Sequence, residues 1–365
     1  MKKKRFLIPL IICGLMIIVN ITARCSEKFS DFYVLKIFPY ISAPLTRFSA
    51  LFPFSLGEIL ICTGILLVLV GIPLFIILIT VMKGRRKKVL SVYFCTVLWI
   101  FTYILSTETL NCFVMYQCTP FSERYFSESG EHNDEQLEKL YAMLIDKANK
   151  LSKEVPRDSE NRFYLQCDYK AEAVKSMKNI SEDYEQLSGY FPKAKPIKFS
   201  YFMSQSNLLG IYFPFSMEAN YNADAVDSNY PSTICHELAH LKGVIQEDEA
   251  NFISFIANIN SDNAEFRYSG YLNALEYVHN EIYRQKITSA YSITDSISDE
   301  VLNDWFRFVP DNYWEDNKEK EIISTEVVET VSDTAIDANI KMNGREDGIK
   351  TYSRVVDLLL DYYYK

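Results

Sequence analysis

Three long stretches without a single charged residue constrain this chain most strongly. They cover residues 6–23, 59–82 and 89–105. A helix needs about 20 apolar residues to cross the hydrocarbon core of a bilayer, and each stretch is close to that length. Helices buried inside soluble proteins seldom remain free of charge over such a length. The sequence therefore predicts three transmembrane helices and a lipid bilayer as a partner.

Charge is divided unevenly along the 365-residue chain. Up to Ser106 there are 13 Lys and Arg against 3 Asp and Glu, so 25 basic and 44 acidic residues remain for the rest. Basic clusters at residues 2–5 and 83–88 flank the apolar stretches, and such clusters stay in the cytoplasm. We therefore expect a cell-membrane anchor over residues 1–107 with a cytoplasmic N-terminus, and an extracytoplasmic domain over residues 108–365. The acidity of this domain argues against nucleic acid as a partner.

The stretch from His236 to His240, with the sequence HELAH, predicts a zinc site. Four residues separate the two histidines, so on a helix they share one face and both rings can reach one zinc ion. Glu237 follows the first histidine, where its carboxylate can take a proton from a metal-bound water. The chain has only four histidines, and two of them fall here. A helix that carries two histidines by coincidence is the weaker interpretation.

A third ligand is expected shortly after the histidine pair. Gly243 can end the helix in a left-handed cap, which lets the chain turn back towards the zinc. Acidic residues at positions 247–249 then suit the start of a second helix. Glu247 is the preferred ligand because Asn251 lies one turn further along its face and can support it. Glu249, which heads an apolar row, remains the alternative. Three protein ligands leave a fourth position open, as in catalytic zinc sites.

The rest of the second half reads as a mostly helical α+β domain. Periodicity predicts helices over residues 134–153, 169–187, 263–285, 298–308, 318–342 and 348–364, and strands over 197–203, 208–215 and 218–221. Ser232 or Thr233 can cap the histidine helix. Cys235 is expected in the core, His132 in a solvated loop, and His279 on a helix away from the site. Cys112 and Cys118 could pair in an oxidising exterior or stay reduced.

The histidine motif together with residues 247–251, Glu-Asp-Glu-Ala-Asn, resembles the gluzincin peptidases. In that group the third ligand is a glutamate on the next helix, which here would be Glu247. The stretches Gly210–Asp224 and Asn343–Leu360 resemble a narrower family of bacterial membrane proteins, which is known as a domain of unknown function and regarded as zinc metallopeptidases. The resemblance implies a zincin-like domain after the anchor. Zincins pair an extended peptide with an edge strand, and Gly210–Phe213 is the candidate.

These features predict a membrane-anchored zinc metallopeptidase that hydrolyses a peptide or protein outside the cytoplasm. Glu237 would act as general base and later protonate the leaving amine. Tyr352, near the terminal stretch, is a candidate for stabilising the oxyanion. The alternative is a non-catalytic membrane zinc protein, a sensor or adaptor, which would tolerate loss of Glu237. An intramembrane protease is disfavoured because charged residues adjoin the motif and a long stretch separates it from the last apolar segment.

Overall fold

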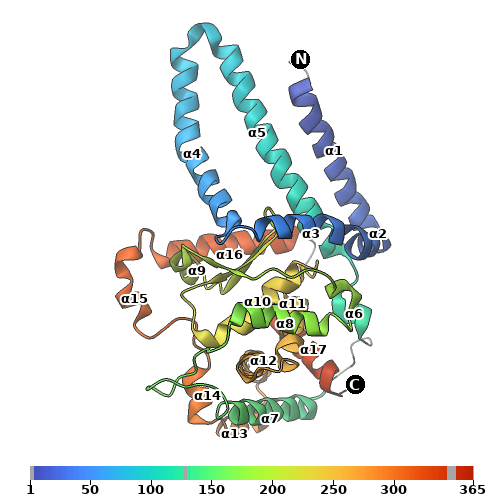
Figure 1. Ribbon diagram of the computed structural model, residues 1–365, viewed down its shortest axis with the longest axis vertical. Coiled ribbons are helices and arrows are strands. Elements are labelled where there is room, and N and C mark those ends of the chain that lie inside the picture. The colour runs from blue at the N-terminus through green and yellow to red at the C-terminus, as the bar shows by residue number, and fades with distance from the viewer. Residues whose placement is uncertain (1–3, 127–129, 131, 343–350, 365) are drawn as a thin grey trace. The chain divides into compact units, whose positions relative to one another are not determined.

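Helices dominate the structure, which is a computed structural model that describes residues 4–126, 130, 132–342 and 351–364 (Figure 1). The chain forms two compact units. Unit 1 comprises Met1–Cys118 and Phe213–Glu218, and unit 2 comprises Thr119–Tyr212 and Ala219–Lys365. The mostly helical α+β class expected from the sequence is confirmed at this coarse level.

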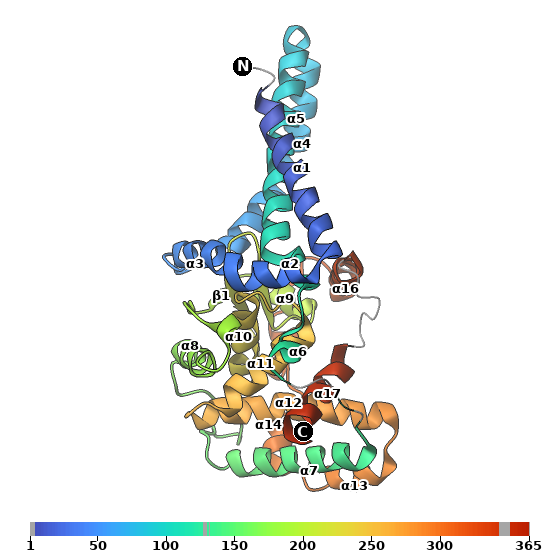
Figure 2. The ribbon, with the colours of Figure 1, turned by 90° about the vertical axis from the view of Figure 1, so that its right-hand side faces the viewer.

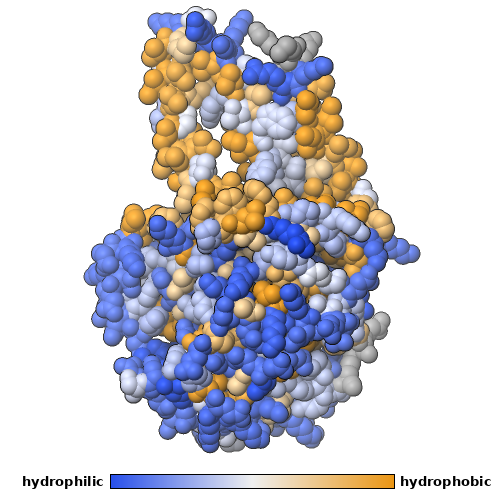
Figure 3. All heavy atoms as spheres, viewed as in Figure 1, coloured by the Kyte–Doolittle hydropathy of each residue, from blue (hydrophilic) through white to orange (hydrophobic). Residues whose placement is uncertain are grey.

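Three helices of unit 1 are long and apolar enough to cross a membrane, counted over the described residues. They are α1 (Lys4–Cys25), α4 (Leu56–Val81) and α5 (Arg86–Glu108). Most of their large side chains are exposed rather than packed, and Figure 3 shows hydrophobic residues gathered along them. The three predicted apolar helices are thus confirmed. Each is a few residues longer than predicted at both ends, except that α4 ends one residue earlier, at Val81. Exposed apolar surface of this extent indicates association with a membrane.

The remainder of unit 1 joins these long helices. Two helices, α2 (Glu27–Phe32) and α3 (Phe38–Ser49), are linked by the π-helical turn Tyr33–Ile37. The 213–218 segment is held within this unit, since the carboxylate of Glu218 accepts hydrogen bonds from the first backbone N–H groups of α4, at Leu56 and Gly57. A carboxylate suits this place because it satisfies orphan donors at the positive end of the helix dipole.

Unit 2 is built around packed helices. Helix α7 (Asp134–Leu151) lies beside α12 (Ala264–Gln285) in both views (Figures 1 and 2). The predicted apolar face of α7 is buried, as is the apolar patch of the terminal helix α17 (Thr351–Tyr364). Helix α8 (Tyr169–Ile180) packs against the helices of the candidate site. The helices predicted near residues 134, 263 and 348 are therefore confirmed.

A small sheet accompanies these helices in the described part of the chain. Its strands are β1 (Lys195–Ile197), β2 (Gly210–Phe213) and β3 (Glu218–Asn222), in the order β1-β3-β2. Strand β1 pairs parallel with β3, and β2 lies at an edge. The strand predicted for 208–215 and its edge position are confirmed. Whether β2 binds a peptide stays a prediction.

Several predicted boundaries were wrong. The strand predicted for residues 197–203 ends at Ile197, and α9 (Ser200–Gln205) follows it. Aromatic residues favoured a strand there, but Tyr201 and Met203 are buried on a helical turn, so packing overrides propensity. The helix predicted over 169–187 ends at Ile180, that over 298–308 covers only Asp299–Asp304 (α14), and that over 318–342 becomes α-helical only at Thr325 (α16, Thr325–Met342). The expected cap at residues 343–344 lies outside the described residues.

Candidate metal centre

The histidines lie on helix α10 (Tyr230–His240). Neither Ser232 nor Thr233 caps this helix, contrary to prediction, because it begins further upstream at Tyr230. Pro231 occupies its first turn, where a missing N–H leaves no hydrogen bond unmade. Ile234, Cys235 and Leu238 are buried, which confirms Cys235 as a core residue. This packed face fixes the rotation of α10 and therefore the direction of both histidines.

A tight turn after α10 brings the next helix back towards the histidines. Gly243 has φ of 81°, a left-handed conformation that glycine adopts without strain. Helix α11 (Glu247–Ile259) then starts at the first of the three acidic residues, as predicted. Helices α10 and α11 pack against each other. The short turn therefore places the first residue of α11 opposite the last turn of α10.

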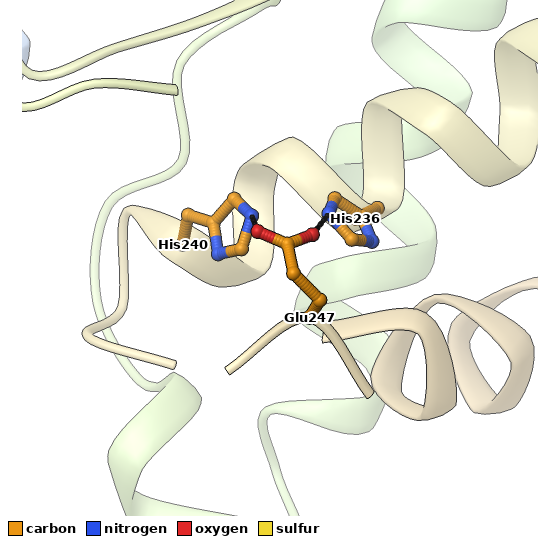
Figure 4. Close-up of side chains that lie close together, drawn as sticks. All are labelled: His236, His240 and Glu247. Carbon is orange, nitrogen blue, oxygen red and sulfur yellow. Dashed lines mark ion pairs between the residues drawn. The ribbon is translucent and has the colours of Figure 1, made fainter. Parts of the chain in front are cut away.

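Three side chains converge between the two helices (Figure 4). The Nε2 atom of His236 lies 3.1 Å from Oε2 of Glu247, and Nε2 of His240 lies 3.7 Å from Oε1. One ligand atom from each residue lies within 4.8 Å of the others, and no further such group of His, Cys, Asp or Glu was found among the described residues. The structure thus brings the three predicted ligands together.

The remaining nitrogen of each ring is held by a hydrogen bond. Nδ1 of His240 lies 2.6 Å from the carbonyl oxygen of Val244, and Nδ1 of His236 lies 2.7 Å from Oδ1 of Asn251. A carbonyl oxygen can only accept, so Nδ1 of His240 carries the proton and its Nε2 presents a lone pair. Asn251 was expected to support Glu247 and instead orients His236. Such outer partners fix the ring orientation of metal-binding histidines.

Burial and neighbouring charges shift the pKa values of the three residues in different directions. Burial alone would lower the pKa of His236, but the hydrogen bond and charge of Glu247 outweigh it and raise the pKa to about 9. Burial lowers the pKa of His240 to about 4. The partial burial of Glu247 would raise its pKa, yet the charges of His240 and His236 and the hydrogen bond to His236 lower it to about 2. The side chain of Glu247 is 49 % exposed, which leaves the cluster open to solvent on one side.

Glu237 is only 4 % exposed. Its Oε2 atom is buried without a hydrogen-bond partner among the described residues. Burial raises the pKa of Glu237 to about 8, although the neighbouring His236 acts to lower it. Strand β2 passes directly against this carboxyl group, because a Cβ atom added at Gly210 would lie 2.4 Å from Oε1 of Glu237. Glycine at this position makes room for the acid.

The other two acidic residues of α11 point away from the histidines. Asp248 and Glu249 are fully buried. Glu249 accepts hydrogen bonds from the backbone N–H and the hydroxyl of Ser122, and Asp248 forms an ion pair with Arg354. Glu249 is thus engaged elsewhere and is not part of the ligand cluster. Neither Ser122 nor Arg354 was singled out from the sequence; the only signal was that Arg354 lies in the terminal stretch that carried the family resemblance.

The other residues singled out from the sequence lie outside the cluster. His132 lies in the loop before α7, as expected, but it is not solvated, because its side chain is 8 % exposed and its Nε2 atom lies 2.8 Å from Asp361. His279 packs among aromatic rings, as expected of a helix histidine. The side chain of Tyr352 lies outside the described residues. Tyr212, which sequence reasoning missed, has its ring 5.8 Å from that of His240.

The sequence left open whether Cys112 and Cys118 of unit 1 pair or stay reduced, and the structure holds both as thiols. Cys112 and Cys118 are both buried. The Sγ atom of Cys118 donates a hydrogen bond to the carbonyl oxygen of Met115. These residues therefore contribute to the packing of unit 1 rather than to a covalent crosslink.

The donor set at the cluster fits zinc. Two imidazole nitrogens and one carboxylate are ligands that zinc prefers, in the number that leaves a position for water. The carboxyl group of Glu237 is on the same helix, and its buried Oε2 atom has no hydrogen-bond partner among the described residues. This is consistent with such a site, because burying an acid without a partner is costly and is found mainly where the acid has a function. No curated protein and no solved structure matches the chain. One family matches residues 33–360, nearly the whole chain, and the expected membership of a domain-of-unknown-function family is thereby confirmed: the chain belongs to the family described as "Protein of unknown function (DUF3810)".

Proposed function

We propose that this protein is a membrane-anchored zinc metallopeptidase with a gluzincin-like site, which hydrolyses peptide bonds outside the cytoplasm. The observation that carries the proposal is the convergence of the Nε2 atoms of His236 and His240 on the carboxylate of Glu247. These three residues would hold the zinc. The family match does not supply the activity, which rests on this geometry and on the buried Glu237 beside it.

Each residue of the site has a distinct role in the proposed reaction. Zinc, when bound, would act as a Lewis acid towards the scissile carbonyl and lower the pKa of a water. Glu237 takes a proton from the attacking water and passes it to the leaving amine. Its burial, which raises the pKa of this carboxyl group in the metal-free protein, favours the protonated form that is needed between the two steps. Asn251 and the carbonyl of Val244 keep the two rings oriented.

Strand β2 is the proposed binding place for the substrate backbone. It is an edge strand, so one of its edges is not used by the sheet. An extended peptide that adds to such an edge is held by backbone hydrogen bonds, largely independent of its sequence. Gly210 of this strand lies against Glu237 and the ring of Tyr212 lies near that of His240. A peptide on β2 would therefore pass beside both the base and the metal ligands.

The decisive experiment compares two variants of the purified full-length protein in detergent. Glu237→Gln should keep about one zinc per chain, because the residue is not a ligand, and should lower cleavage of a mixture of fluorogenic peptides at least about a hundredfold. His236→Ala should lose both zinc and cleavage. If the glutamine variant cleaved as fast as the parent, Glu237 would not be the general base and the proposed mechanism would be wrong. If the parent itself bound zinc but cleaved no peptide, the non-catalytic sensor or adaptor would be the better description.

The placement of the site outside the cytoplasm also belongs to the proposal. Its basis is the basic clusters at residues 2–5 and 83–88, which favour the cytoplasmic side. A reporter enzyme that is active only outside the cytoplasm should work when fused after Lys365 and fail when inserted within residues 84–88. The reverse pattern would place the candidate site in the cytoplasm and exclude an extracytoplasmic substrate.

A further inference from the structure

The first turn of α11 carries three consecutive carboxylates that divide between two opposite environments. Glu247 is half-exposed and faces the histidines. Asp248 and Glu249 are fully buried on the other side. Successive residues of a helix lie about 100° apart, so the direction of Glu247 is tied to the burial of its two neighbours. Whatever holds these neighbours in place also determines where Glu247 points.

Arg354 on α17 provides much of that hold. Its Nε atom lies 2.8 Å from Oδ2 of Asp248, and one terminal nitrogen lies 3.3 Å from Oε1 of Glu249. The same nitrogen lies 3.6 Å from Glu123. One guanidinium therefore contacts both buried acids, and the flat fork of arginine suits such double contact better than lysine. Ser122 completes the arrangement with two hydrogen bonds to Glu249.

Loss of this cation would remove an ion pair from each of two adjacent carboxylates that are fully buried. Removing one partner of a buried ion pair is strongly destabilising, because the remaining charge loses its compensation in a place that water does not reach. The two carboxylates would be relieved by turning towards solvent, and because α11 begins at Glu247 its first turn has no preceding helical turn to hold it. Such a rotation would carry the carboxylate of Glu247 away from the two histidines. The helices α11 and α17 pack along each other, so the contact is part of a larger interface.

We propose that Arg354 is a positioning residue for the metal centre, which fixes Glu247 in its ligand direction by pairing with Asp248 and Glu249. This inference rests on the proposed function, because it takes Glu247 to be the third ligand. It assigns a task to the C-terminal helix, which contributes no residue to the ligand cluster. The terminal stretch is then required for the metal site and not only for closing the core.

Zinc affinity of the full-length protein in detergent, measured by competition with a chromophoric chelator, tests the proposal. Arg354→Met should weaken zinc binding roughly 10–100-fold, the usual effect of losing an outer partner of a metal ligand. Arg354→Lys keeps the charge but not the fork, and should lie between parent and Met variant. Arg284→Met is the matched control, because Arg284 pairs with Glu281 on α12, elsewhere in unit 2. It should leave the affinity unchanged.

A double-mutant cycle separates positioning from general destabilisation. If Arg354 acts through Glu247, Arg354→Met should cause no further loss of zinc affinity in a Glu247→Ala background. The visible absorption of bound Co²⁺ should also change in Arg354→Met and approach that of Glu247→Ala. Full additivity in the cycle, or a cobalt spectrum unchanged from the parent, would overturn the proposal. Should Arg354→Met fail to fold, the same double-mutant cycle with Arg354→Lys and Glu247→Ala tests the proposal.

The two proposals fail in different ways. A parent protein that binds zinc tightly, together with an Arg354→Met variant of equal affinity, would refute the positioning role and leave the proposed function standing. A parent protein that binds no zinc would refute the proposed function, and the role of Arg354 with it.

Discussion

All four histidines of the chain lie in unit 2, and they form two contrasting pairs. His236 and His240 share one helix and direct their Nε2 atoms at one carboxylate, that of Glu247. His132 and His279 lie far apart in sequence and have separate partners. His132 pairs with Asp361, and Nδ1 of His279 lies 2.7 Å from the hydroxyl of Tyr141.

The contrast shows which features distinguish a candidate metal centre from structural histidines. Distance to a carboxylate does not, since the His132–Asp361 contact at 2.8 Å is shorter than the His236–Glu247 contact at 3.1 Å. The difference lies in the number of ligand atoms that converge, because zinc requires at least three protein ligands in such sites. Solvent access differs too: Glu247 is 49 % exposed and Asp361 is 10 % exposed. The following predictions test this comparison.

Removal of either clustered histidine should have the largest effect. His236→Ala and His240→Ala each delete a direct ligand, and we expect zinc affinity to fall by more than roughly a hundredfold, beyond the range for outer partners. Metal content after dialysis against a weak chelator measures this loss. If both variants kept one zinc ion per chain, His236 and His240 would not be ligands, and the proposed difference between the two histidine pairs would be wrong.

The second prediction compares the first and third acidic residues of α11. Glu247→Ala should also weaken zinc binding more than about a hundredfold, since a metal bond is lost. Glu249→Ala should weaken it less than about tenfold, because Arg354 still pairs with Asp248 and the three ligands are unchanged. Chelator competition on both variants provides the comparison. If only Glu249→Ala emptied the site, the turn after Gly243 would have been assigned wrongly.

The third prediction concerns pH. Glu247 raises the pKa of His236 to about 9, so in the metal-free protein His236 is protonated at neutral pH. Zinc can bind this nitrogen only after the proton has left, so protons compete with the metal below pH 9. Apparent zinc affinity should therefore rise about tenfold per pH unit between pH 7 and 9, as expected for one released proton. An affinity independent of pH in that range would contradict a protonated His236.

The smallest effect is expected at the other histidine pair. His132→Ala and His279→Ala should change zinc affinity less than about twofold, because neither ring belongs to the cluster. His132→Ala should lower the free energy of unfolding by about 1–3 kcal/mol, since it leaves Asp361 without its imidazole partner in a mostly buried place. Chemical denaturation and chelator competition on the same samples report the two quantities. A loss of zinc in His132→Ala would mean that the two regions are coupled.

Much of the site could be predicted because its essential relations are local. The four-residue spacing of His236 and His240 guarantees a shared face once a helix forms. Gly243 predicts the turn, and the acidic residues that follow predict the start of the next helix. The apolar helices α1, α4 and α5 were equally predictable, because length and lack of charge are properties of a continuous stretch. The return of the chain towards the two histidines, which Figure 4 shows, follows from these few positions.

The contacts that the sequence did not reveal all join different elements of the chain, whereas the wrong element boundaries and the wrong cap of α10 were local errors. Asn251 forms a hydrogen bond with His236 and not with Glu247, and His132 pairs with Asp361 of α17. The residues that hold the buried acids of α11, Ser122 and Arg354, come from 127 and 105 positions away, respectively, from Glu249. No periodicity or spacing encodes such pairings.

Sequence alone thus determined the apolar helices, the histidine helix and the turn that returns a carboxylate to it. Each depends on residues within one or two helical turns, whose geometry is fixed by the backbone. The tertiary structure decided which acid faces the histidines, which side chains orient their rings and which buried charges are neutralised. Those choices depend on the packing of helices α10, α11 and α17, and packing is set by the shape of the whole core rather than by any one segment.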